Sequence, residues 1–487
     1  MPVWDFLSAI VPIQPLKKFA GILGQEGFAE AGAIAYELAA KDIAAKNQGR
    51  KAQELDQSRK DWLGPDFGSL VHTVRIIYGA DLIPSINILG VKLRTGTTAQ
   101  AFGDKVYVRK NYGPTTDTDD DEKINQLVHL AHELVHVRQY HNLGKSLHKF
   151  GKAYFRGFYQ ADFSYTKNHM EAEAINFHRC FHTRLFSPIA VLEMWRSTLV
   201  KGFTSIMPFV LSNQQHFLAY KSSDGTAKIG RIHSDGQGSD TIWSTPANQK
   251  WTKGWTSFVP FLLGGKPHYL AYKSGSGQVA IDRIRDDGKG VDTIWSTQGA
   301  ENWSKGWTSF VPFSLSGKPC YLAYKRGNGQ VAIDRILADG KGVDTLWPTQ
   351  GVEKWTKGWS SFVPFVIDGA PHYLAYKEGS GTVHIDRIRN GGQGVDNVWQ
   401  GQWSDKWTSM IGFTFQGRPH ILSYKNEWGY AHIDSVNDGG AGTTHLWCDK
   451  WTKGWTAFFP FTLNAKPFHL VYKKNTGTVA IDLVGPV

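Results

Sequence analysis

Two histidines and a glutamate in the segment 127–144 have the residue types and the spacing of a metal-dependent hydrolase. The segment reads LVHLAHELVHVRQYHNLG and contains His132, Glu133 and His136. Residues four apart on a helix lie on one face about one turn apart, so the two imidazoles would point to one place. Zinc sites of hydrolases combine neutral imidazole ligands, an open position for water and a nearby carboxylate as general base. The pattern therefore predicts Zn2+ held by His132 and His136, with Glu133 as the catalytic base.

The five-residue pattern also occurs by chance, and two histidines at this spacing can be ordinary surface residues. The flanking residues are apolar, which indicates a buried helix where unpaired polar groups are costly. We expect the helix to span about residues 124–143. An acidic run at 117–122 precedes it, where a helix N-terminus favours negative charge, and Asn142 to Gly144 form a stop signal.

A third protein ligand is needed, and the next suitable group lies in a second predicted helix over about residues 169–186. Glu171 is followed three positions later by an alanine, a spacing that turns the glutamate towards the metal and lets two helices pack closely. Glu173 points elsewhere on that helix. His141 is a competing ligand, but five residues after His136 it leaves the shared face. The sequence therefore favours Glu171. Four further histidines read as ordinary surface or core residues: His148, His169, His178 and His182. One of them, or Tyr154 or Tyr159, could stabilise an oxyanion, and the sequence does not choose among them.

The segments 91–94, 101–108 and 130–139, together with the patch around Glu171, carry a resemblance to a known family. The span from about residue 83 to 173 resembles the HExxH zinc-peptidase-like domain of effectors of bacterial extracellular contractile injection systems and of related toxins. The resemblance covers roughly a fifth of the chain. It implies an α+β, zincin-like metallopeptidase domain with a gluzincin-like ligand set of HExxH plus Glu, acting on a peptide or protein substrate.

The remaining residues of the first 188 read as support for this site. Residues 1–60 carry a helical pattern rich in Ala, Glu and Lys, which favours a packing helix over a membrane or partner helix. Short alternating runs between 70 and 112 predict strands beside the zinc helix. We therefore expect a zinc metallopeptidase-like domain over residues 1–188.

Length and composition limit the possible functions. A chain of 487 residues is long enough for two or more domains. The net charge of +11 is spread over many loops, which fits attraction to acidic surfaces better than a nucleic-acid groove. No apolar run reaches 18 residues, so no membrane span is expected. The N-terminus lacks the pattern of a signal peptide, which predicts synthesis in the cytoplasm, with export by a non-classical or injection machinery open.

From about residue 190 the sequence repeats. The marker W-x-x-x-W begins copies that are 52, 52, 48 and 48 residues apart, and an earlier copy has Leu199 and Phe203 in its place. A period near 50 indicates a propeller or array, and these positions define six copies. The tryptophan pairs are Trp251/Trp255, Trp303/Trp307, Trp355/Trp359, Trp403/Trp407 and Trp451/Trp455.

Each copy contains four strand-like runs separated by Gly- and Asp-rich turns, which is typical of a propeller blade. The first run carries a proline in five copies, as an edge strand tolerates. The last copy lacks its fourth run, and an additional run of that type, 191–195, precedes the first copy. We therefore expect an all-β, six-bladed β-propeller over residues 189–487, in which the N-terminal strand closes the last blade.

The tryptophans have two possible roles. Seventeen of the 19 lie at or beyond residue 195, and an indole at a blade edge can stack on the apolar face of a sugar. Tryptophans also fill space between blades, which is the expected role of those inside the fourth strands. The W-x-x-x-W pairs straddle the turn into the first strand, and their first members are the better ligand candidates.

The segments W-x-K-G-W-T-S-F-V-P-F, H-Y-L-A-Y-K and V-A-I-D-R-I recur in these copies. In this they resemble the bacterial fucose-binding propeller lectins of the PLL type, over some 290 residues. The resemblance implies glycan ligands, fucosylated ones included, in pockets between adjacent blades. Those lectins typically have seven blades.

Together these observations predict a toxin- or effector-like zinc metallopeptidase fused to a glycan-binding propeller that targets it to carbohydrate. One alternative is a multivalent lectin whose zinc domain is structural or inactive. Another is a propeller that binds a protein partner.

Overall fold

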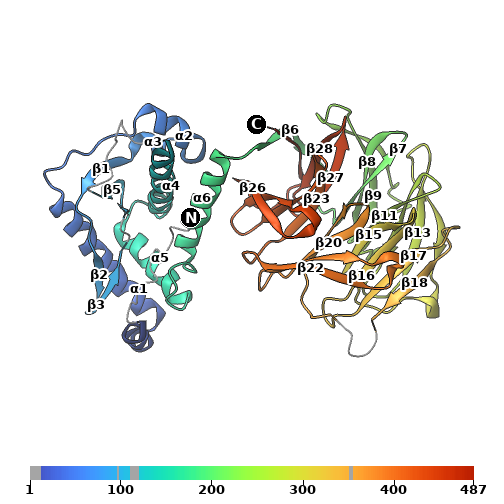
Figure 1. Ribbon diagram of the computed structural model, residues 1–487, viewed down its shortest axis with the longest axis horizontal. Helices are drawn as coiled ribbons and strands as arrows, with labels where there is room; N and C mark the ends of the chain where they lie inside the picture. Colours follow the sequence, from blue (N-terminus) through green and yellow to red (C-terminus); the bar gives the residue numbers. More distant parts are fainter. Residues whose placement is uncertain (1–12, 96–97, 110–119, 350–354, 487) are drawn as a thin grey trace. The chain divides into compact units, whose positions relative to one another are not determined.

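The chain divides into two compact units, Met1–Phe186 and Ser187–Val487. The structure, a computed structural model, describes residues 13–95, 98–109, 120–349 and 355–486 (Figure 1). The N-terminal segment read for a signal peptide, up to residue 12, and the first part of the predicted acidic run, 117–119, lie outside the described residues. Among the helices in these ranges, none combines the length and the apolar character that a membrane crossing requires.

The first unit combines six helices with five short strands in its described part. They are α1 (Ile13–Lys46), α2 (Gln57–Phe67), α3 (Leu70–Thr73), β1 (Arg75–Ala80), β2 (Ser85–Ile88), β3 (Val91–Arg94), β4 (Ala99–Phe102), β5 (Lys105–Arg109), α4 (Asp120–Asn142), α5 (Leu147–Gln160) and α6 (His169–Leu185). Strands β1, β5 and β4 form one sheet in that order, and β2 pairs with β3 as a separate hairpin. The helix expected at 124–143 corresponds to α4, and the one expected at 169–186 corresponds to α6.

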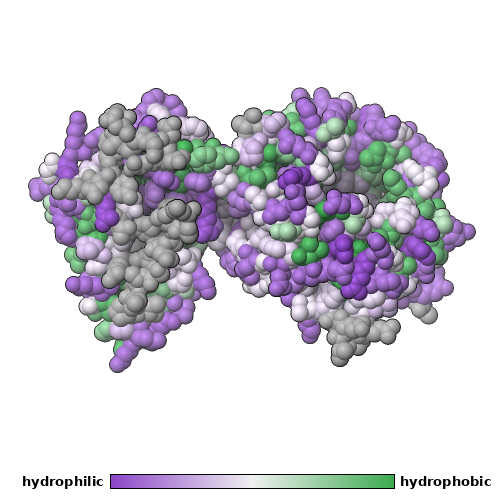
Figure 2. All heavy atoms as spheres, viewed as in Figure 1, coloured by the Kyte–Doolittle hydropathy of each residue, from purple (hydrophilic) through white to green (hydrophobic). Residues whose placement is uncertain are grey.

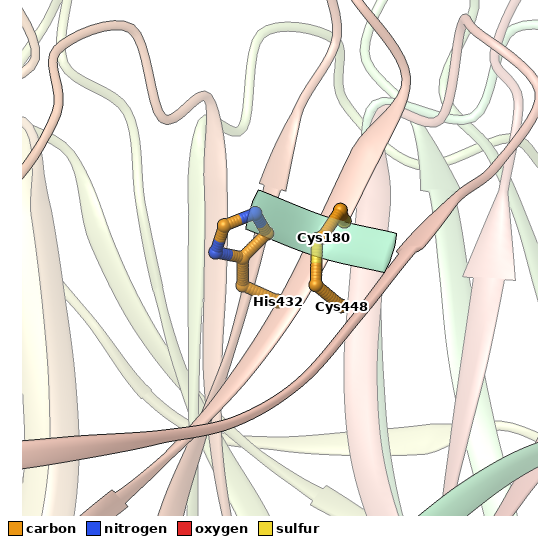
Figure 3. A group of neighbouring side chains, drawn as sticks. All are labelled: Cys180, His432 and Cys448. Atoms are coloured by element: carbon orange, nitrogen blue, oxygen red, sulfur yellow. The ribbon is translucent and has the colours of Figure 1, made fainter. Parts of the chain in front are cut away.

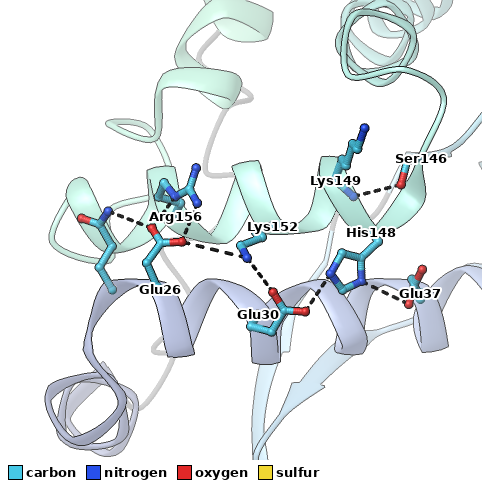
Figure 4. A network of polar contacts seen from close by, with 9 residues as sticks. Glu26, Glu30, Glu37, Ser146, His148, Lys149, Lys152 and Arg156 are labelled. Atoms are coloured by element: carbon cyan, nitrogen blue, oxygen red, sulfur yellow. Dashed lines mark hydrogen bonds and ion pairs between the residues drawn. The ribbon is translucent and has the colours of Figure 1, made fainter.

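Helices α1 and α5 pack closely against each other. A Cβ atom at Gly151 of α5 would lie 2.8 Å from the Cβ of Tyr36 on α1, so only glycine fits there. Oppositely charged side chains join the exposed edges of the two helices (Figure 4). The ion pairs are Arg156–Glu26 at 2.6 Å, Lys152–Glu30 at 2.7 Å and His148–Glu30 at 2.7 Å. This contact fixes α5, one of the helices that surround the predicted metal site.

Helix α4 is the central element of the first unit. Its residues Ala131, Leu134, Val135 and Val137 are fully buried, and it contacts α6, α2, α5 and strands β4 and β5. From Leu127 to His141 every residue of α4 is buried or half-buried, which makes this part of α4 a core helix. The histidines that it carries are therefore held in a rigid environment.

The second unit is all-β in its described part. Strands β6 to β29 form six four-stranded antiparallel sheets. In five of them the chain order is the sheet order, so each sheet is a meander. The strands are β6 (Ile189–Thr198), β7 (Ser205–Leu211), β8 (Gln214–Lys221), β9 (Thr226–Ile232), β10 (Ser239–Ser244), β11 (Ser257–Leu263), β12 (Lys266–Tyr272), β13 (Val279–Ile284), β14 (Val291–Ser296), β15 (Ser309–Leu315), β16 (Lys318–Tyr324), β17 (Val331–Ile336), β18 (Val343–Pro348), β19 (Ser361–Ile367), β20 (Ala370–Tyr376), β21 (Thr382–Ile388), β22 (Val395–Gln402), β23 (Ser409–Phe415), β24 (Arg418–Lys425), β25 (Tyr430–Val436), β26 (Thr443–Lys450), β27 (Ala457–Leu463), β28 (Lys466–Tyr472) and β29 (Thr478–Pro486), with 3-10 turns η1 (Gly299–Glu301), η3 (Asn390–Gly392) and η4 (Asp438–Gly440).

The sixth sheet joins the two ends of this unit. Strand β6 pairs antiparallel with β29, and the order is β27-β28-β29-β6. The first strands of successive sheets are neighbours in chain order from β7 to β27, and β27 also contacts β7. The first strand of every sheet is an edge strand, which is where the prolines of the repeat lie.

The interfaces between neighbouring sheets are filled by repeated apolar and aromatic residues. One cluster combines Leu270, Tyr272 and Ile281 of the second sheet with Trp307 and Tyr321 of the third. Residues opposite each other in register lie side by side, as His432 on β25 and Cys448 on β26 do (Figure 3). Hydrophilic residues cover much of the visible surface of each unit, with apolar side chains scattered among them (Figure 2).

Candidate metal centre

Helix α4 presents His132 and His136 on one face. Their side chains are 16% and 10% exposed, and the two rings lie edge to face with centroids 5.1 Å apart. The i, i+4 spacing on a helix produces this arrangement. Buried apolar residues of α4 surround the two imidazoles, which are therefore polar groups on a largely buried face of the helix.

Helix α6 presents the carboxylate of Glu171 from its first turn. Asn168, which is fully buried, caps this helix by accepting a hydrogen bond from the backbone N–H of Met170 at 3.3 Å. The start of α6 approaches α5 closely because the facing residue is Gly157, where a Cβ would lie 2.5 Å from Asn168 Oδ1. The cap and the glycine together fix where α6 begins, and therefore the position of Glu171 in its first turn.

The three predicted ligands meet. One ligand atom from each of His132, His136 and Glu171 lies within 4.8 Å of the others. Glu171 Oε2 is 3.6 Å from Nε2 of His132 and 3.4 Å from Nε2 of His136. Two atoms bound to one tetrahedral zinc at 2.0–2.1 Å are themselves about 3.4 Å apart. The spacing suits a shared ion better than direct hydrogen bonds.

The carboxylate of Glu171 gives an independent test of the fit to a metal. Its residue is 4% exposed, and its Oε2 has no hydrogen-bond partner. A buried, ionised oxygen without a partner is costly unless a cation compensates it. Two imidazole nitrogens and one carboxylate oxygen are also the donor set of many catalytic zinc sites with one open position. The residues present therefore fit a bound metal ion.

Gln139 orients the second histidine. Its Oε1 lies 2.9 Å from Nδ1 of His136, and its Nε2 donates to the carbonyl of Met170 and to Oε2 of Glu173, both at 3.0 Å. Because the amide nitrogen of Gln139 donates elsewhere, its oxygen must accept from His136 Nδ1–H. When the ring is neutral, this tautomer leaves His136 Nε2 unprotonated and directed at Glu171, as a metal ligand requires.

Three tyrosines surround the acidic groups of the site. Tyr154 of α5 donates to Oε1 of Glu171 at 2.7 Å, which leaves Oε2 to face the histidines. Burial and then the charge of Glu171 raise the pKa of Tyr154 and of Tyr165 well above the usual value. Tyr36 of α1 donates to the carbonyl of Ala101 at 2.9 Å. Tyr154 is one of the side chains that the sequence singles out, whereas Tyr36, Tyr165 and the contacts of Gln139 carry no spacing signal that would identify them.

The titration of the site follows from burial and from the carboxylate of Glu171. Burial raises the pKa of Glu133, although the neighbouring His132 and His136 oppose this effect. Burial alone would lower the pKa of His136, but the charge of Glu171 outweighs it and raises that pKa to about 9. Burial, followed by the proximity of His132, lowers the pKa of His178 to about 3. His178 lies against His132 with ring centroids 6.0 Å apart.

Other residues considered as ligands or oxyanion donors lie elsewhere or have other partners. His141 Nε2 contacts the carboxylate of Asp104, and Glu173 contacts Arg138 and Gln139. The ring of Tyr159 packs on Phe28 and Phe163 in the core. These contacts are consistent with Glu171 as the third ligand.

No protein-family model and no curated protein matches this chain. Inferences about its chemistry therefore rest on its own residues.

The tryptophan pairs of the second unit divide into two environments. The second members are buried, with 3–8% of their surface exposed: Trp255, Trp307, Trp359, Trp407 and Trp455. The first members are half-buried and pack against tyrosines or a histidine of the sheets: Trp251, Trp303, Trp355, Trp403 and Trp451. Trp251, for example, lies between the rings of Tyr220 and Tyr269, at 6.1 and 6.4 Å. Both members contribute to packing between sheets, and the first retains an exposed edge.

A polar cavity of about 530 Å³ opens between the third and fourth sheets. It is lined by the turn Ser314–Ser316 and by residues of the next sheet, including Arg387, Arg389 and Asp396. Asp396 accepts hydrogen bonds from both guanidinium groups, at 3.0 and 2.7 Å. The cavity has the size of a small-molecule site and contains no tryptophan.

Proposed function

We propose that the first unit is a zinc-dependent peptidase. The observation that carries the proposal is the buried Oε2 of Glu171, which has no hydrogen-bond partner and lies 3.4 and 3.6 Å from the Nε2 atoms of the two histidines that flank a glutamate on α4. This donor set and the neighbouring carboxylate of Glu133 are what hydrolysis of an amide at a zinc site needs.

Zinc, when bound, acts as a Lewis acid that polarises the substrate carbonyl and lowers the pKa of water. Glu133 accepts a proton from the attacking water at its carboxylate and transfers it to the departing amine. Tyr154 holds Glu171, and Gln139 holds His136, in the orientations that binding requires. Burial excludes bulk water and raises the pKa of Glu133, which makes its carboxylate a better base.

The finer assignment of the fold is part of the proposal. The first unit would be zincin-like, with α4 and α6 as its ligand-bearing helices. The six sheets of the second unit would be the blades of a six-bladed propeller. The pairing of β6 with β29 and the contact of β27 with β7 support this assignment.

The second unit would bind carbohydrate and direct the peptidase to glycan-bearing surfaces, in the manner of a toxin or effector delivered by an injection machinery. The resemblance of its repeats to the PLL-type lectins supports this role, as does the polar cavity between two sheets. Several weak sites on one ring would add by effective concentration. The alternatives are a lectin with an inactive zinc unit and a ring that binds a protein partner.

Replacement of Glu133 by alanine separates the peptidase from a merely structural zinc unit. Wild type and Glu133→Ala should both contain about one zinc per chain, since the glutamate is not a ligand, but only wild type should cleave a peptide library. Glu301→Ala, at an exposed glutamate of the second unit, is the control and should cleave as wild type does. If zinc-loaded wild type cleaves no peptide, the catalytic proposal is wrong. A glycan array and a pull-down then distinguish the lectin from the protein-binding ring.

A further inference from the structure

The second unit repeats a contact between a lysine and a buried tryptophan. In five sheets a lysine Nζ lies 4.6–4.7 Å from the centre of the indole of the second tryptophan, and four of these lysines share a second contact. The same Nζ donates to a Ser or Thr hydroxyl of the W-x-x-x-W loop at 2.7–3.2 Å. The four lysines are Lys273, Lys325, Lys377 and Lys473, and we call them the indole lysines.

All four indole lysines lie at one end of the sheets. Each lysine comes directly after the second strand of its sheet. The last residue of that strand pairs with the first residue of the first strand, as Tyr272 of β12 pairs with Ser257 of β11. The loop of the next copy rests on the turn after each lysine: Gly306 N donates to the carbonyl of Ser274 at 3.1 Å, and Gly358 N donates to that of Arg326 at 3.2 Å. Backbone bonds therefore link successive loops of the repeat into a continuous surface.

The indole lysines are cations without carboxylate partners. Among the described residues, no Asp or Glu lies within ion-pair distance of any of the four. Lys325 is only 7% exposed, and burial lowers its pKa. An ammonium has three N–H donors, and an indole face and one hydroxyl use only part of this hydrogen-bonding capacity. By contrast Lys221, in the copy with Phe203 at the second tryptophan position, pairs with Asp224 at 2.9 Å.

A second lysine adds to the charge of each site. The W-x-K-G-W loops carry one exposed lysine each, two residues before the buried tryptophan: Lys253, Lys305, Lys357 and Lys453. The turn that follows Lys473 begins with Lys474, whereas Arg326, which follows Lys325, lies 3.9 Å from the carboxylate of Glu378. Sheets pack about 10 Å apart, so neighbouring sites repeat on that scale around the ring.

The chemistry of these sites favours an acidic polysaccharide over other polyanions. Serine and threonine hydroxyls and neutral turns such as Ser274–Gly277 surround the ammonium groups and suit the hydroxyls of a sugar. The indoles are covered by the lysines or stacked between rings, so this surface offers no free aromatic platform for nucleobases. At this end of the sheets, the described loops of the second to fourth copies expose no large apolar side chain that could enter a bilayer.

We propose that this end of the second unit binds sulfated or uronate-bearing polysaccharide through the indole lysines and the exposed lysines beside them. The inference deepens the proposed glycan-binding role and rests on it, but it concerns a surface distinct from the polar cavity between sheets. Each anionic group would be held by an ammonium pair from one copy, with its neighbours in the polymer reaching the next copy.

The test compares two variants that remove the same charge at opposite ends of the same sheets. Lys253→Gln/Lys305→Gln alters the proposed surface. Lys289→Gln/Lys341→Gln alters exposed lysines in the turns between third and fourth strands, at the other end. Binding of heparin to the full chain is measured by calorimetry between about 50 and 300 mM salt, a range over which counterion release changes the affinity strongly. We expect the first variant to bind about tenfold more weakly and to lose about two from the slope of log affinity against log salt, since two cations are removed. The control variant should bind as wild type does.

Other probes separate this proposal from its competitors. If both variants lose affinity equally, or if duplex DNA binds as tightly as heparin, the attraction is non-specific and the proposal is wrong. Tighter binding to vesicles containing phosphatidylserine than to heparin would also overturn it in favour of a membrane surface. Binding of neutral glycans without heparin binding would refute the lysine surface and leave the glycan-binding role standing, whereas failure of all glycans would refute both. Zinc content should be equal in all variants.

Discussion

Zinc binding by the first unit should strengthen about 50-fold between pH 7 and pH 9. His136 must lose a proton before its Nε2 can bind a metal. Glu171, whose Oε2 is 3.4 Å away, raises the pKa of His136 to about 9 in spite of its burial. About one metal-free molecule in a hundred then has a neutral ring at pH 7 and about half of them do at pH 9, a gain that corresponds to about 2.3 kcal/mol.

The substitution Glu171→Gln should abolish this dependence. Glutamine keeps the size of the side chain but removes the charge that holds the proton on His136, so burial should bring the pKa of His136 to 6.5 or below. The variant should bind zinc more weakly at every pH, with an affinity that is flat from pH 7 to pH 9. Affinities are measured by competition with a chromophoric chelator, corrected for the titration of the chelator itself. A flat profile for wild type, or one equally steep for Glu171→Gln, would refute the electrostatic coupling of these two side chains.

The same pair determines how the stability of the metal-free protein depends on pH, with the opposite sign. The pKa of His136 is raised on folding, so its contribution is fully present below about pH 6.5 and is lost as the pH rises through 9. Between pH 7 and pH 10 the metal-free first unit should lose about 2–3 kcal/mol of unfolding free energy. Chemical denaturation after removal of metal measures this loss, and Glu171→Gln should not show it.

Three further predictions concern the supporting residues. Gln139→Leu should lower zinc affinity about 10- to 100-fold, as loss of such a partner does at other metal sites, in the same chelator assay; unchanged affinity would show that the amide is not needed. Gly151→Ala should destabilise the first unit by about 1–3 kcal/mol, because its methyl group would lie 2.8 Å from a side-chain atom of α1. Gly21→Ala, with open space around it, should not destabilise the unit in calorimetry, and equal effects would argue against the close packing of the helices. Trp359→Ala should cost the second unit about 3–5 kcal/mol, whereas Val366→Ala, at a 60% exposed residue, should change its melting by less than about 0.5 kcal/mol; a mild loss at Trp359 would show that it is not a packing residue.

Much of the candidate metal centre could be predicted from local patterns in the sequence. The i, i+4 spacing on a helix predicts that His132 and His136 share a face. The start of a second predicted helix, 35 residues after His136, identified Glu171 as the third ligand. The sequence did not predict the side chains that hold these ligands in position. Gln139 reaches His136 within one helix, but its other contacts and the bond from Tyr154 to Glu171 depend on how three helices pack. The position of Tyr36 depends on a helix some 100 residues before the site in the chain.

In the repeats, the period of about 50 residues and the alternating runs predicted four strands per copy and the edge position of the proline strands. The same pattern could not decide the environment of each tryptophan in a pair. The buried position of Trp255 follows from the register of β11 on β12 and from the approach of Lys273 over its ring. Such contacts join residues that are remote in the repeat, and hydrophobic periodicity carries no information about them.

The pairing of β6 with β29 has a consequence for the kinetics of folding. The two strands are separated by the whole chain from Thr198 to Thr478, so their hydrogen bonds form only after a very large loop has closed. Topologies dominated by such non-local pairing fold slowly, and until closure both strands expose unpaired edges that can join other chains. The second unit should therefore pass through a long-lived open intermediate during synthesis, in which the protein is most vulnerable to aggregation and most dependent on chaperones.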